Sequence, residues 1–250
     1  MSHLKNLTNV KVVTDISALA RAAAQEFYRC ADSAIAARNR FCVALSGGTT
    51  PRGVYAFLAE DQRTHTHRLS WDRIYIFFGD ERHVPPDHPD SNYRMANEAF
   101  LSRVPLPSGN IFRMRGELEA GEAARQYEEQ LRTFFNLQPD EWPQFDLIFL
   151  GLGDDGHTAS LFPGSKALEE KSKLVVANWV EKFSDYRLTL TFPALNHAAE
   201  VAFLVSGENK AQILKDVLRP AAGQSYPAQR VQPENGKLLW VADQAAARLL

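Results

Sequence analysis

The sequence predicts an α/β fold in which a mostly parallel β-sheet carries helices on both faces. Short, almost wholly apolar runs alternate along the chain with longer segments of helical periodicity, which is typical of strand–helix–strand units. Apolar runs of this kind suit parallel strands that are covered on both sides. The 250 residues suffice for one large core, and no linker, repeat or low-complexity segment divides them. We therefore expect residues 1–250 to form one domain.

The elements of the first half follow in chain order. A β-branched run predicts an edge strand, and an Ala-rich segment with large apolar side chains three or four positions apart predicts an amphipathic helix capped by Asp15 or Ser17. The next strand stops at a glycine pair, after which Thr50 as N-cap and Pro51 as first helical residue begin a new helix. The expected elements are residues 10–13 (strand), 16–38 (helix), 40–45 (strand), 51–59 (helix), 73–78 (strand), 92–101 (helix) and 118–135 (helix).

The second half repeats the alternation. Two apolar runs end at glycine-containing turns and predict buried strands, and a shorter alternating segment between them predicts a further strand. Amphipathic segments follow the later strands. The expected elements are residues 145–150 (strand), 187–191 (strand), 200–205 (strand), 209–218 (helix), 237–241 (strand) and 244–250 (helix).

Composition and charge argue against several partner classes. The net charge of -2 gives no whole-protein positive field, so we expect no nucleic-acid partner. No window approaches the roughly 20 apolar residues that span a bilayer, and residues 1–14 lack the apolar run of a signal peptide, so we expect a cytoplasmic protein without a membrane partner. Cys30 and Cys42 have no metal-type neighbours and are expected to be core thiols. The sequence identifies no protein partner.

The first strand end predicts a phosphate cradle. It consists of Ser46, Gly47, Gly48, Thr49, Thr50 and Pro51. The two glycines allow a tight turn and a close approach to a ligand, and the following helix start offers unpaired N–H groups and a partial positive charge. Neither the P-loop pattern nor the three-glycine dinucleotide pattern is present. An ordinary turn with a capping threonine is the competing interpretation, and the local sequence favours neither.

The second strand end, residues 79–85, combines two acids with an arginine. Arg82 is suited to two-pronged capture of a phosphate, and Asp80 or Glu81 is placed to orient it or to contact sugar hydroxyls. The competing interpretation is a surface ion cluster worth at most about 1 kcal/mol. No spacing groups His83 or His88 with other metal-binding residues, so we expect no metal site.

The third strand end, residues 151–164 with the sequence GLGDDGHTASLFPG, predicts a general base. A neutral imidazole accepts a proton from water near neutral pH, and a carboxylate that fixes its tautomer improves it. Asp155 lies two residues before His157, with Gly156 between them to permit the turn. For an isolated Asp-Gly-His, a histidine that merely starts a helix capped by the aspartate is the commoner arrangement.

Together these segments resemble the glucosamine-6-phosphate isomerase/6-phosphogluconolactonase family. The similar stretches are collinear and span most of the chain: ALSGGTTP (44–51), GDERHVP (79–85), DSNY (90–93), GLGDDGHTASLFPG (151–164) and, more weakly, residues 187–198 and 207–210. The resemblance implies a Rossmann-like sheet and hydrolysis of 6-phospho-D-glucono-1,5-lactone to 6-phospho-D-gluconate, the second step of the oxidative pentose phosphate pathway. It implies no metal or organic cofactor.

The resemblance also implies roles for single residues. His157 takes a proton from the attacking water, Asp155 holds His157, and Arg187 binds phosphate or developing negative charge. Backbone N–H groups near residues 151–156 are candidate oxyanion donors, and a covalent route through Ser160 is disfavoured because no Gly-x-Ser-x-Gly surrounds it. The residues expected to bind or border the sugar phosphate are Ser46, Gly47, Gly48, Thr49, Asp80, Arg82, Arg187 and Lys210.

Three alternatives stay open. An amino-sugar phosphate deaminase of the same group is one, although its motif resembles Asp-Glu-Tyr where this chain has Arg82, and the residues after Asp-Gly favour the lactonase. A non-catalytic sugar-phosphate sensor needs the cradle but not Asp155 and His157. A purely structural role fits any single motif, but not all three at successive strand ends.

Overall fold

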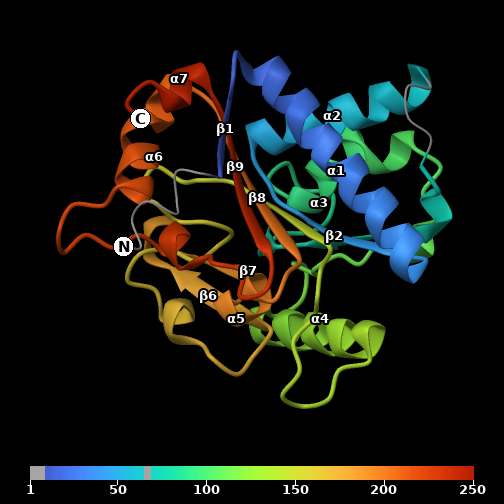
Figure 1. Ribbon diagram of the computed structural model, residues 1–250. Coiled ribbons are helices and arrows are strands. Elements are labelled where there is room, and N and C mark those ends of the chain that lie inside the picture. The colour runs from blue at the N-terminus through green and yellow to red at the C-terminus, as the bar shows by residue number, and fades with distance from the viewer. Residues whose placement is uncertain (1–8, 65–68) are drawn as a thin grey trace.

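The computed structural model describes residues 9–64 and 69–250, which pack around one parallel β-sheet (Figure 1). Six strands form this sheet in the order β1-β9-β8-β5-β2-β3, and every neighbouring pair in it is parallel. The strands are β1 (Val10–Val13), β2 (Phe41–Leu45), β3 (Ile74–Phe78), β5 (Leu147–Leu150), β8 (Glu200–Val205) and β9 (Lys237–Asp243). The predicted mostly parallel sheet, with β1 at its edge, is confirmed.

Helices cover both faces of the sheet, as expected. Alternate residues of each strand point to opposite faces, so Val43 packs with one group of helices and Ala44 with the other. One face packs against α1 (Ile16–Arg38), α2 (Thr49–Thr64) and α3 (Asn92–Ala99). The other packs against α4 (Ala120–Phe135), α5 (Phe192–Asn196), α6 (Ala211–Leu218) and α7 (Gln244–Ala247). Short 3₁₀ helices occupy Trp71–Arg73, Leu101–Arg103, Ser108–Asn110, Lys166–Glu169, Glu181–Phe183, Glu208–Lys210 and Pro227–Arg230.

A second, antiparallel sheet lies over the second face, and the sequence predicted only part of it. Its order is β4-β7-β6, formed by Asp80–Arg82, Asp185–Leu190 and Val175–Val180. The strand expected at 187–191 belongs here rather than to the parallel sheet. Asp80 pairs with Thr189, and the Leu190 N–H donates to the Gly79 carbonyl at 2.8 Å. The chain therefore passes directly from the end of β3 into the small sheet.

The predicted helix ends are partly wrong. Asp15 caps α1 by accepting the Ala18 N–H at 2.8 Å, as expected. The second helix, however, begins at Thr49, so Thr50 is not its N-cap, and it extends to Thr64 rather than to about residue 59. Pro51 is then the third helical residue, which costs no hydrogen bond because first-turn N–H groups have no intrahelical acceptor.

Other expectations concern the thiols and the membrane. Cys30 and Cys42 are both buried free thiols, which confirms their assignment to the core. Within residues 9–64 and 69–250, no helix has the length and apolarity that a bilayer crossing requires. Residues 1–8 of the amino-terminal segment, on which the expected lack of a signal peptide rests, lie outside the described residues.

Candidate active site

The predicted strand ends meet in one cavity of about 280 Å³ at the carboxyl edge of the parallel sheet. Parallel strands in register end together: β2 pairs with β3 from Phe41 and Ile74 to Leu45 and Phe78. Ligands of open α/β sheets bind at this edge. Of the predicted site residues, all but Asp155 and Arg187 line the cavity: Ser46, Gly47, Gly48, Thr49, Asp80, Arg82, His157 and Lys210.

The glycine turn after β2 forms one wall. Gly48 has a φ of +103°, a conformation that L side chains rarely adopt, and its carbonyl accepts the first helical hydrogen bond, from the Arg52 N–H at 3.1 Å. The N–H groups of Thr49 and Thr50 therefore have no acceptor within α2, and they face the edge where the helix dipole is positive. The local geometry fits an anion.

Ser46 brings a hydroxyl to the same wall. Its backbone is held from both sides by the Tyr55 hydroxyl, which accepts the Ser46 N–H at 2.9 Å and donates to the Ser46 carbonyl at 2.9 Å. The Ser46 Oγ is buried and has no hydrogen-bond partner among the described residues. A fixed, unpaired hydroxyl beside a cavity is suited to a polar ligand, because a buried hydroxyl without a partner is otherwise costly.

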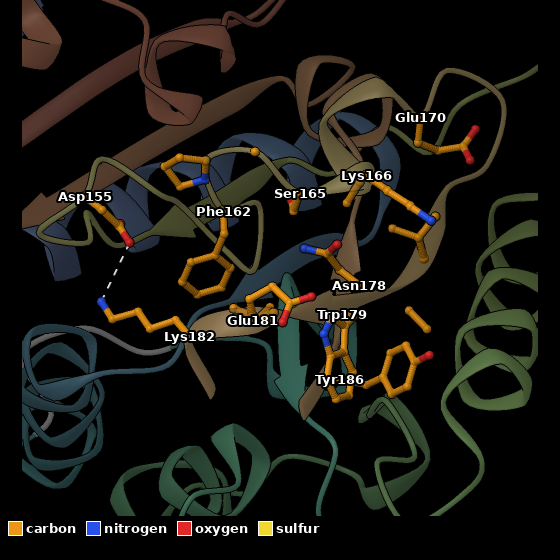
Figure 2. Close-up of a pocket in the computed structure, with 16 residues that line it drawn as sticks. Asp155, Phe162, Ser165, Lys166, Glu170, Asn178, Trp179, Glu181, Lys182 and Tyr186 are labelled. Carbon is orange, nitrogen blue, oxygen red and sulfur yellow. Dashed lines mark ion pairs between the residues drawn. The ribbon is translucent and has the colours of Figure 1, made fainter. Parts of the chain in front are cut away.

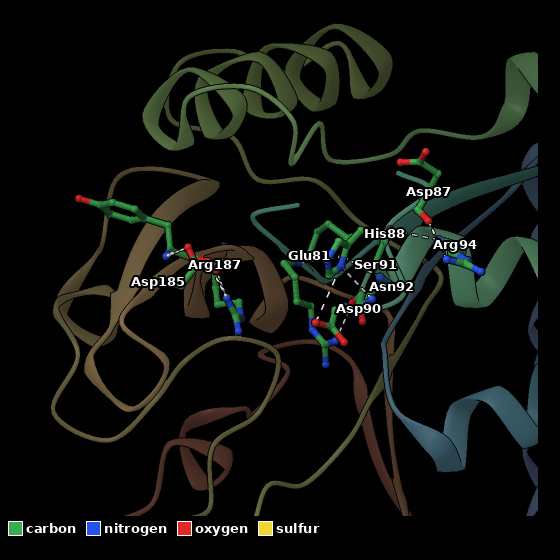
Figure 3. Close-up of polar contacts among 11 residues, drawn as sticks. Glu81, Asp87, His88, Asp90, Ser91, Asn92, Arg94, Asp185 and Arg187 are labelled. Atoms are coloured by element: carbon green, nitrogen blue, oxygen red, sulfur yellow. Dashed lines mark hydrogen bonds and ion pairs between the residues drawn. The ribbon is translucent and has the colours of Figure 1, made fainter. Parts of the chain in front are cut away.

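The acids after β3 have different roles. Glu81 is buried and does not line the cavity; its carboxylate accepts the Ser91 hydroxyl at 2.9 Å and the N–H groups of Asn92 and Tyr93 at 2.6 and 2.8 Å (Figure 3). Burial raises the pKa of Glu81, although these hydrogen bonds favour the charged form. Glu81 thus builds the start of α3, and of the two acids only Asp80 faces the site.

Asp80 is immobilised by its neighbours. Its Oδ2 accepts the Ser160 hydroxyl at 2.7 Å, and its Oδ1 and carbonyl accept the Asn92 amide at 3.2 and 2.9 Å. Because the Ser160 hydroxyl is buried and donates to Asp80, the geometry gives no support to a covalent route through Ser160. Asn92 also lines the cavity, although the sequence indicated only a helix start there.

Arg82 and Lys210, two of the three cations that line the cavity, differ in how they are paired. The Arg82 Nη1 donates to the Asp90 carbonyl at 2.7 Å, and no carboxylate of the described residues forms an ion pair with it. The Lys210 ammonium pairs with Asp154, whose side chain is largely exposed. An incoming phosphate therefore meets an unpaired guanidinium at Arg82 but competes with a carboxylate for Lys210.

Arg187 lies in an adjoining cavity of about 330 Å³ that shares Asp80, Arg82 and His157 with the first. Its guanidinium pairs with Asp185 at 2.9 Å and lies 4.9 Å from the centre of the Phe183 ring. The ion pair appears at the left of Figure 3. Arg187 is thus near the site but already neutralised.

The third strand end holds a histidine–carboxylate pair. His157 lies in an irregular loop, so the competing interpretation of a helix-start histidine is wrong. The His157 Nδ1 bonds to Asp155 Oδ1, which also accepts the His157 backbone N–H at 3.1 Å. Gly156 between them has a φ of +76°. Nδ1 is engaged, so Nε2 is the nitrogen left for a ligand or water in the cavity that His157 lines.

Lys182 completes this pair from the 3₁₀ helix between β6 and β7; it also lines the cavity, although no sequence pattern indicated it. Its ammonium lies 3.7 Å from Asp155 Oδ2, the oxygen that does not bind His157 (Figure 2). Burial opposes ionisation of Asp155, but the hydrogen bond to His157 and the charges of His157 and Lys182 outweigh it and lower the pKa of Asp155. Asp155 is thus kept as an anion beside the imidazole.

One other group of potential metal ligands lies at the opposite edge of the sheet. In the described part of the chain, only Glu26, Cys30 and Glu200 bring three such atoms within 4.8 Å of one another. Arg29 pairs with both glutamates, so a positive charge is already supplied there.

Comparisons with known proteins point to one family. Residues 14–240 match the family model of glucosamine-6-phosphate isomerases/6-phosphogluconolactonase. The chain is 42% identical to 6-phosphogluconolactonase from Nostoc sp. over 239 residues, which cover 95% of this chain and 96% of that protein. It is 41% identical to the Homo sapiens 6-phosphogluconolactonase over 238 residues, 94% and 89% of the two chains. The solved structure of 6-phosphogluconolactonase from Thermotoga maritima is similar with a TM-score of 0.79, 32% identity and coverage of 94% and 99%.

Proposed function

This chain belongs to the glucosamine-6-phosphate isomerase/6-phosphogluconolactonase family, and from that premise we propose that His157 is the general base with which it hydrolyses 6-phospho-D-glucono-1,5-lactone. The reaction is lactone hydrolysis in the pentose phosphate pathway, and the relatives compared above are 6-phosphogluconolactonases. The observation that carries the mechanism is that His157, which is hydrogen-bonded to Asp155, lines the same cavity as the helix start after β2.

The substrate is held by its 6-phosphate at the cradle. The N–H groups of Thr49 and Thr50 and the Ser46 hydroxyl donate to phosphate oxygens, and the guanidinium of Arg82 supplies charge. The ammonium of Lys210 also binds the phosphate, once it has left its ion pair with Asp154. Arg187 is a weaker contributor, because Asp185 offsets its charge. Asp80, fixed by Ser160 and Asn92, is placed to accept sugar hydroxyls.

The chemical step begins at His157. Its Nε2 takes a proton from water, whose oxygen adds to the lactone carbonyl carbon and gives a tetrahedral anion. The bond from that carbon to the ring oxygen then breaks, and the imidazolium returns the proton to the leaving oxygen. The carboxylic acid that results loses its own proton to solvent. Asp155 holds the tautomer and stabilises the imidazolium; such acid–base assistance is typically worth about 10²–10⁴-fold in rate.

The loop geometry excludes two of the candidate oxyanion donors. The Gly153 N–H donates to the His157 carbonyl at 2.9 Å and the Gly156 N–H to the Gly153 carbonyl at 3.0 Å. Both groups hold the turn that carries His157, so neither is open for the tetrahedral anion. Gly151, Leu152 and Asp154 also line the cavity, and their N–H groups stay the candidate donors.

One assay tests the reaction against its rivals. Acid release from freshly prepared 6-phosphogluconolactone is followed with and without the protein, beside ammonia release from glucosamine 6-phosphate. We expect strong acceleration of the first and none of the second. Ammonia release alone would assign the deaminase reaction, and substrate binding without either reaction would make the protein a sensor. The single domain and the cytoplasmic location stay predictions.

A further inference from the structure

We propose that Phe162 is a positioning residue for the general base: its ring fixes the plane of the His157 imidazole and stabilises the protonated form of that ring. The inference deepens the proposed function and rests on it, because it assigns a partner to the base rather than a new reaction. It is carried by the packing around His157, which places one aromatic ring directly against the imidazole.

The contact is close and nearly parallel. The ring centres of His157 and Phe162 are 4.0 Å apart, with 26° between the ring planes, and Phe162 is buried. The loop between them reverses to make this possible: Thr158 and Leu161 form an isolated bridge, and the Leu161 N–H donates to the Thr158 carbonyl at 2.9 Å. Ala159 takes a φ of +46° within this reversal, which is uncommon for a residue with a side chain. The strained conformation of Ala159 is thus part of the reversal that packs Phe162 against His157.

The backbone at Gly153 packs closely against one side of the His157 imidazole. A Cβ at Gly153 would lie 2.0 Å from both Cε1 and Nδ1 of His157, so only glycine allows the backbone this close to the ring. Asp155 holds Nδ1 through its hydrogen bond. Between these contacts and the Phe162 ring, rotation of the imidazole is restricted and Nε2 keeps one direction. A general base held in a fixed direction avoids the loss of rate that a misplaced catalytic group would cause.

The chemistry of the step gives the stacking a second effect. When Nε2 takes the proton of water, the imidazole becomes a cation against an aromatic ring, and such pairs are attractive. Phe162 also forms part of the wall of a neighbouring cavity of about 880 Å³, which Asp155 and Lys182 line but His157 does not (Figure 2). Phe162 also lines the cavity of about 330 Å³ together with His157 and Arg187, so it borders both spaces.

The charged groups around His157 do not include Phe162. The groups that face His157 or its cavities are the hydrogen-bonded Asp155 with Lys182, the pair of Asp154 and Lys210, Asp80 with Arg82, the pair of Asp185 and Arg187, and Asp90. A substitution at Phe162 alters none of these charges. A change in the protonation behaviour of His157 in such a variant therefore reports the ring itself.

The test compares Phe162→Leu with Phe162→Tyr. Leucine keeps apolar volume but lacks the aromatic face, so we expect kcat to fall about tenfold, KM to stay within about twofold, and the acidic limb of kcat/KM to move about 0.4–0.7 pH units lower. Tyrosine restores the ring and should return both kcat and the limb to wild-type values. Trp179→Leu, which removes an aromatic side chain from the wall of the larger cavity, should change neither.

Several results would overturn the inference. These are a Phe162→Leu enzyme with unchanged kcat and pH limb, a loss confined to KM, or a tyrosine variant as impaired as leucine. If leucine prevents folding, Phe162→Met replaces it, and a proton NMR titration of His157 reads the same shift without turnover. The proposed function fails differently: wild-type protein would not accelerate lactone hydrolysis, or His157→Ala would keep full activity.

Discussion

The two edges of the parallel sheet carry ionisable clusters of opposite character. At the carboxyl edge, Asp155 and His157 form a pair beside a cavity, with side chains that stay 33% and 24% exposed. At the amino edge, Arg29 of α1 joins Glu26 to Glu200, the first residue of β8, which is only 4% exposed. The first cluster borders the cavity, and we call its side of the sheet the open edge. The second lies between α1 and the sheet at the amino edge, where Glu200 is buried and the Arg29 side chain is 44% exposed.

The two environments shift carboxyl pKa values in opposite directions. Asp155 has His157 on one oxygen and Lys182 on the other, and these outweigh burial and lower its pKa. Burial, followed by the hydrogen bond with Glu26, raises the pKa of Glu200 to about 7 even though Arg29 opposes the shift. Asp155 stays charged because two cations lie next to a single carboxylate, whereas Glu200 holds a proton because it shares one arginine with a second acid.

The largest effect is expected from Asp155→Asn at the open edge. An amide cannot hold the tautomer that leaves Nε2 as acceptor, so kcat should fall about 10²–10⁴-fold with little change in KM. Asp146→Asn is the matched control at the amino edge, where Asp146 pairs with Arg38 and accepts the Cys42 N–H at 2.7 Å. It should lower the free energy of unfolding and leave kcat alone. A kcat within threefold of wild type in Asp155→Asn would remove the contrast between the edges.

Next in size is Arg82→Ala. Removal of a charged donor to phosphate should raise KM about 10–100-fold while kcat changes little, since the contact is made equally in ground and transition states. Steady-state kinetics measures both constants. Arg38→Ala, which breaks the ion pair with Asp146 at the amino edge, should lower Tm without raising KM. A loss of kcat at constant KM in Arg82→Ala would argue against a phosphate clamp.

Glu200 at the amino edge should make the free energy of unfolding depend on pH. An unfolded glutamate releases its proton near pH 4.5, whereas native Glu200 holds it to about 7, so the free energy of unfolding should fall as pH rises from 5 to 8. Glu26→Gln removes the competing acid and should flatten this fall by on the order of 1 kcal/mol. Urea unfolding at both pH values measures it, with Glu122→Gln on the exposed side of α4 as control. Parallel pH curves for Glu26→Gln and wild type would contradict the shared proton.

The smallest change in KM is expected from Asp154→Asn, and it tests the role of Lys210. Asp154→Asn removes the carboxylate that pairs with Lys210, so the ammonium is available to phosphate and KM should fall about two- to threefold. The same substitution in a Lys210→Ala background should have no effect on KM. A higher KM in the single variant would mean that Asp154, rather than Lys210, contacts the substrate.

The sequence predicted the parallel sheet well because its signals are local. The helix at Ile16–Arg38 and the strand at Glu200–Val205 have the predicted ends, since a capping aspartate and an apolar run mark them. The small sheet was largely missed. β4 has three residues, and β6 (Val175–Val180) places an exposed Trp179 and a buried Asn178 in one strand, so neither shows a clear pattern. Their pairing with β7 depends on contacts far apart in the chain.

The site divides in the same way. Ser46, Asp80 and His157 follow strands of the parallel sheet, so their convergence in one cavity followed from topology. Asn92 and Lys182 come from a helix start and from the turn between β6 and β7, and only the folded chain brings them to Asp80 and Asp155. The pairing of Lys210 with Asp154 was equally beyond local sequence patterns, because 56 positions separate the two residues.

The measurement that tests the central proposal most directly is single-variant kinetics of His157→Ala with parallel titration of the product. The kcat of His157→Ala should be about 10²–10⁴-fold lower than that of the wild type. The Kd for 6-phosphogluconate should stay within about twofold, because the phosphate cradle is intact. Turnover at the wild-type rate, with the same affinity, would show that another group activates the water.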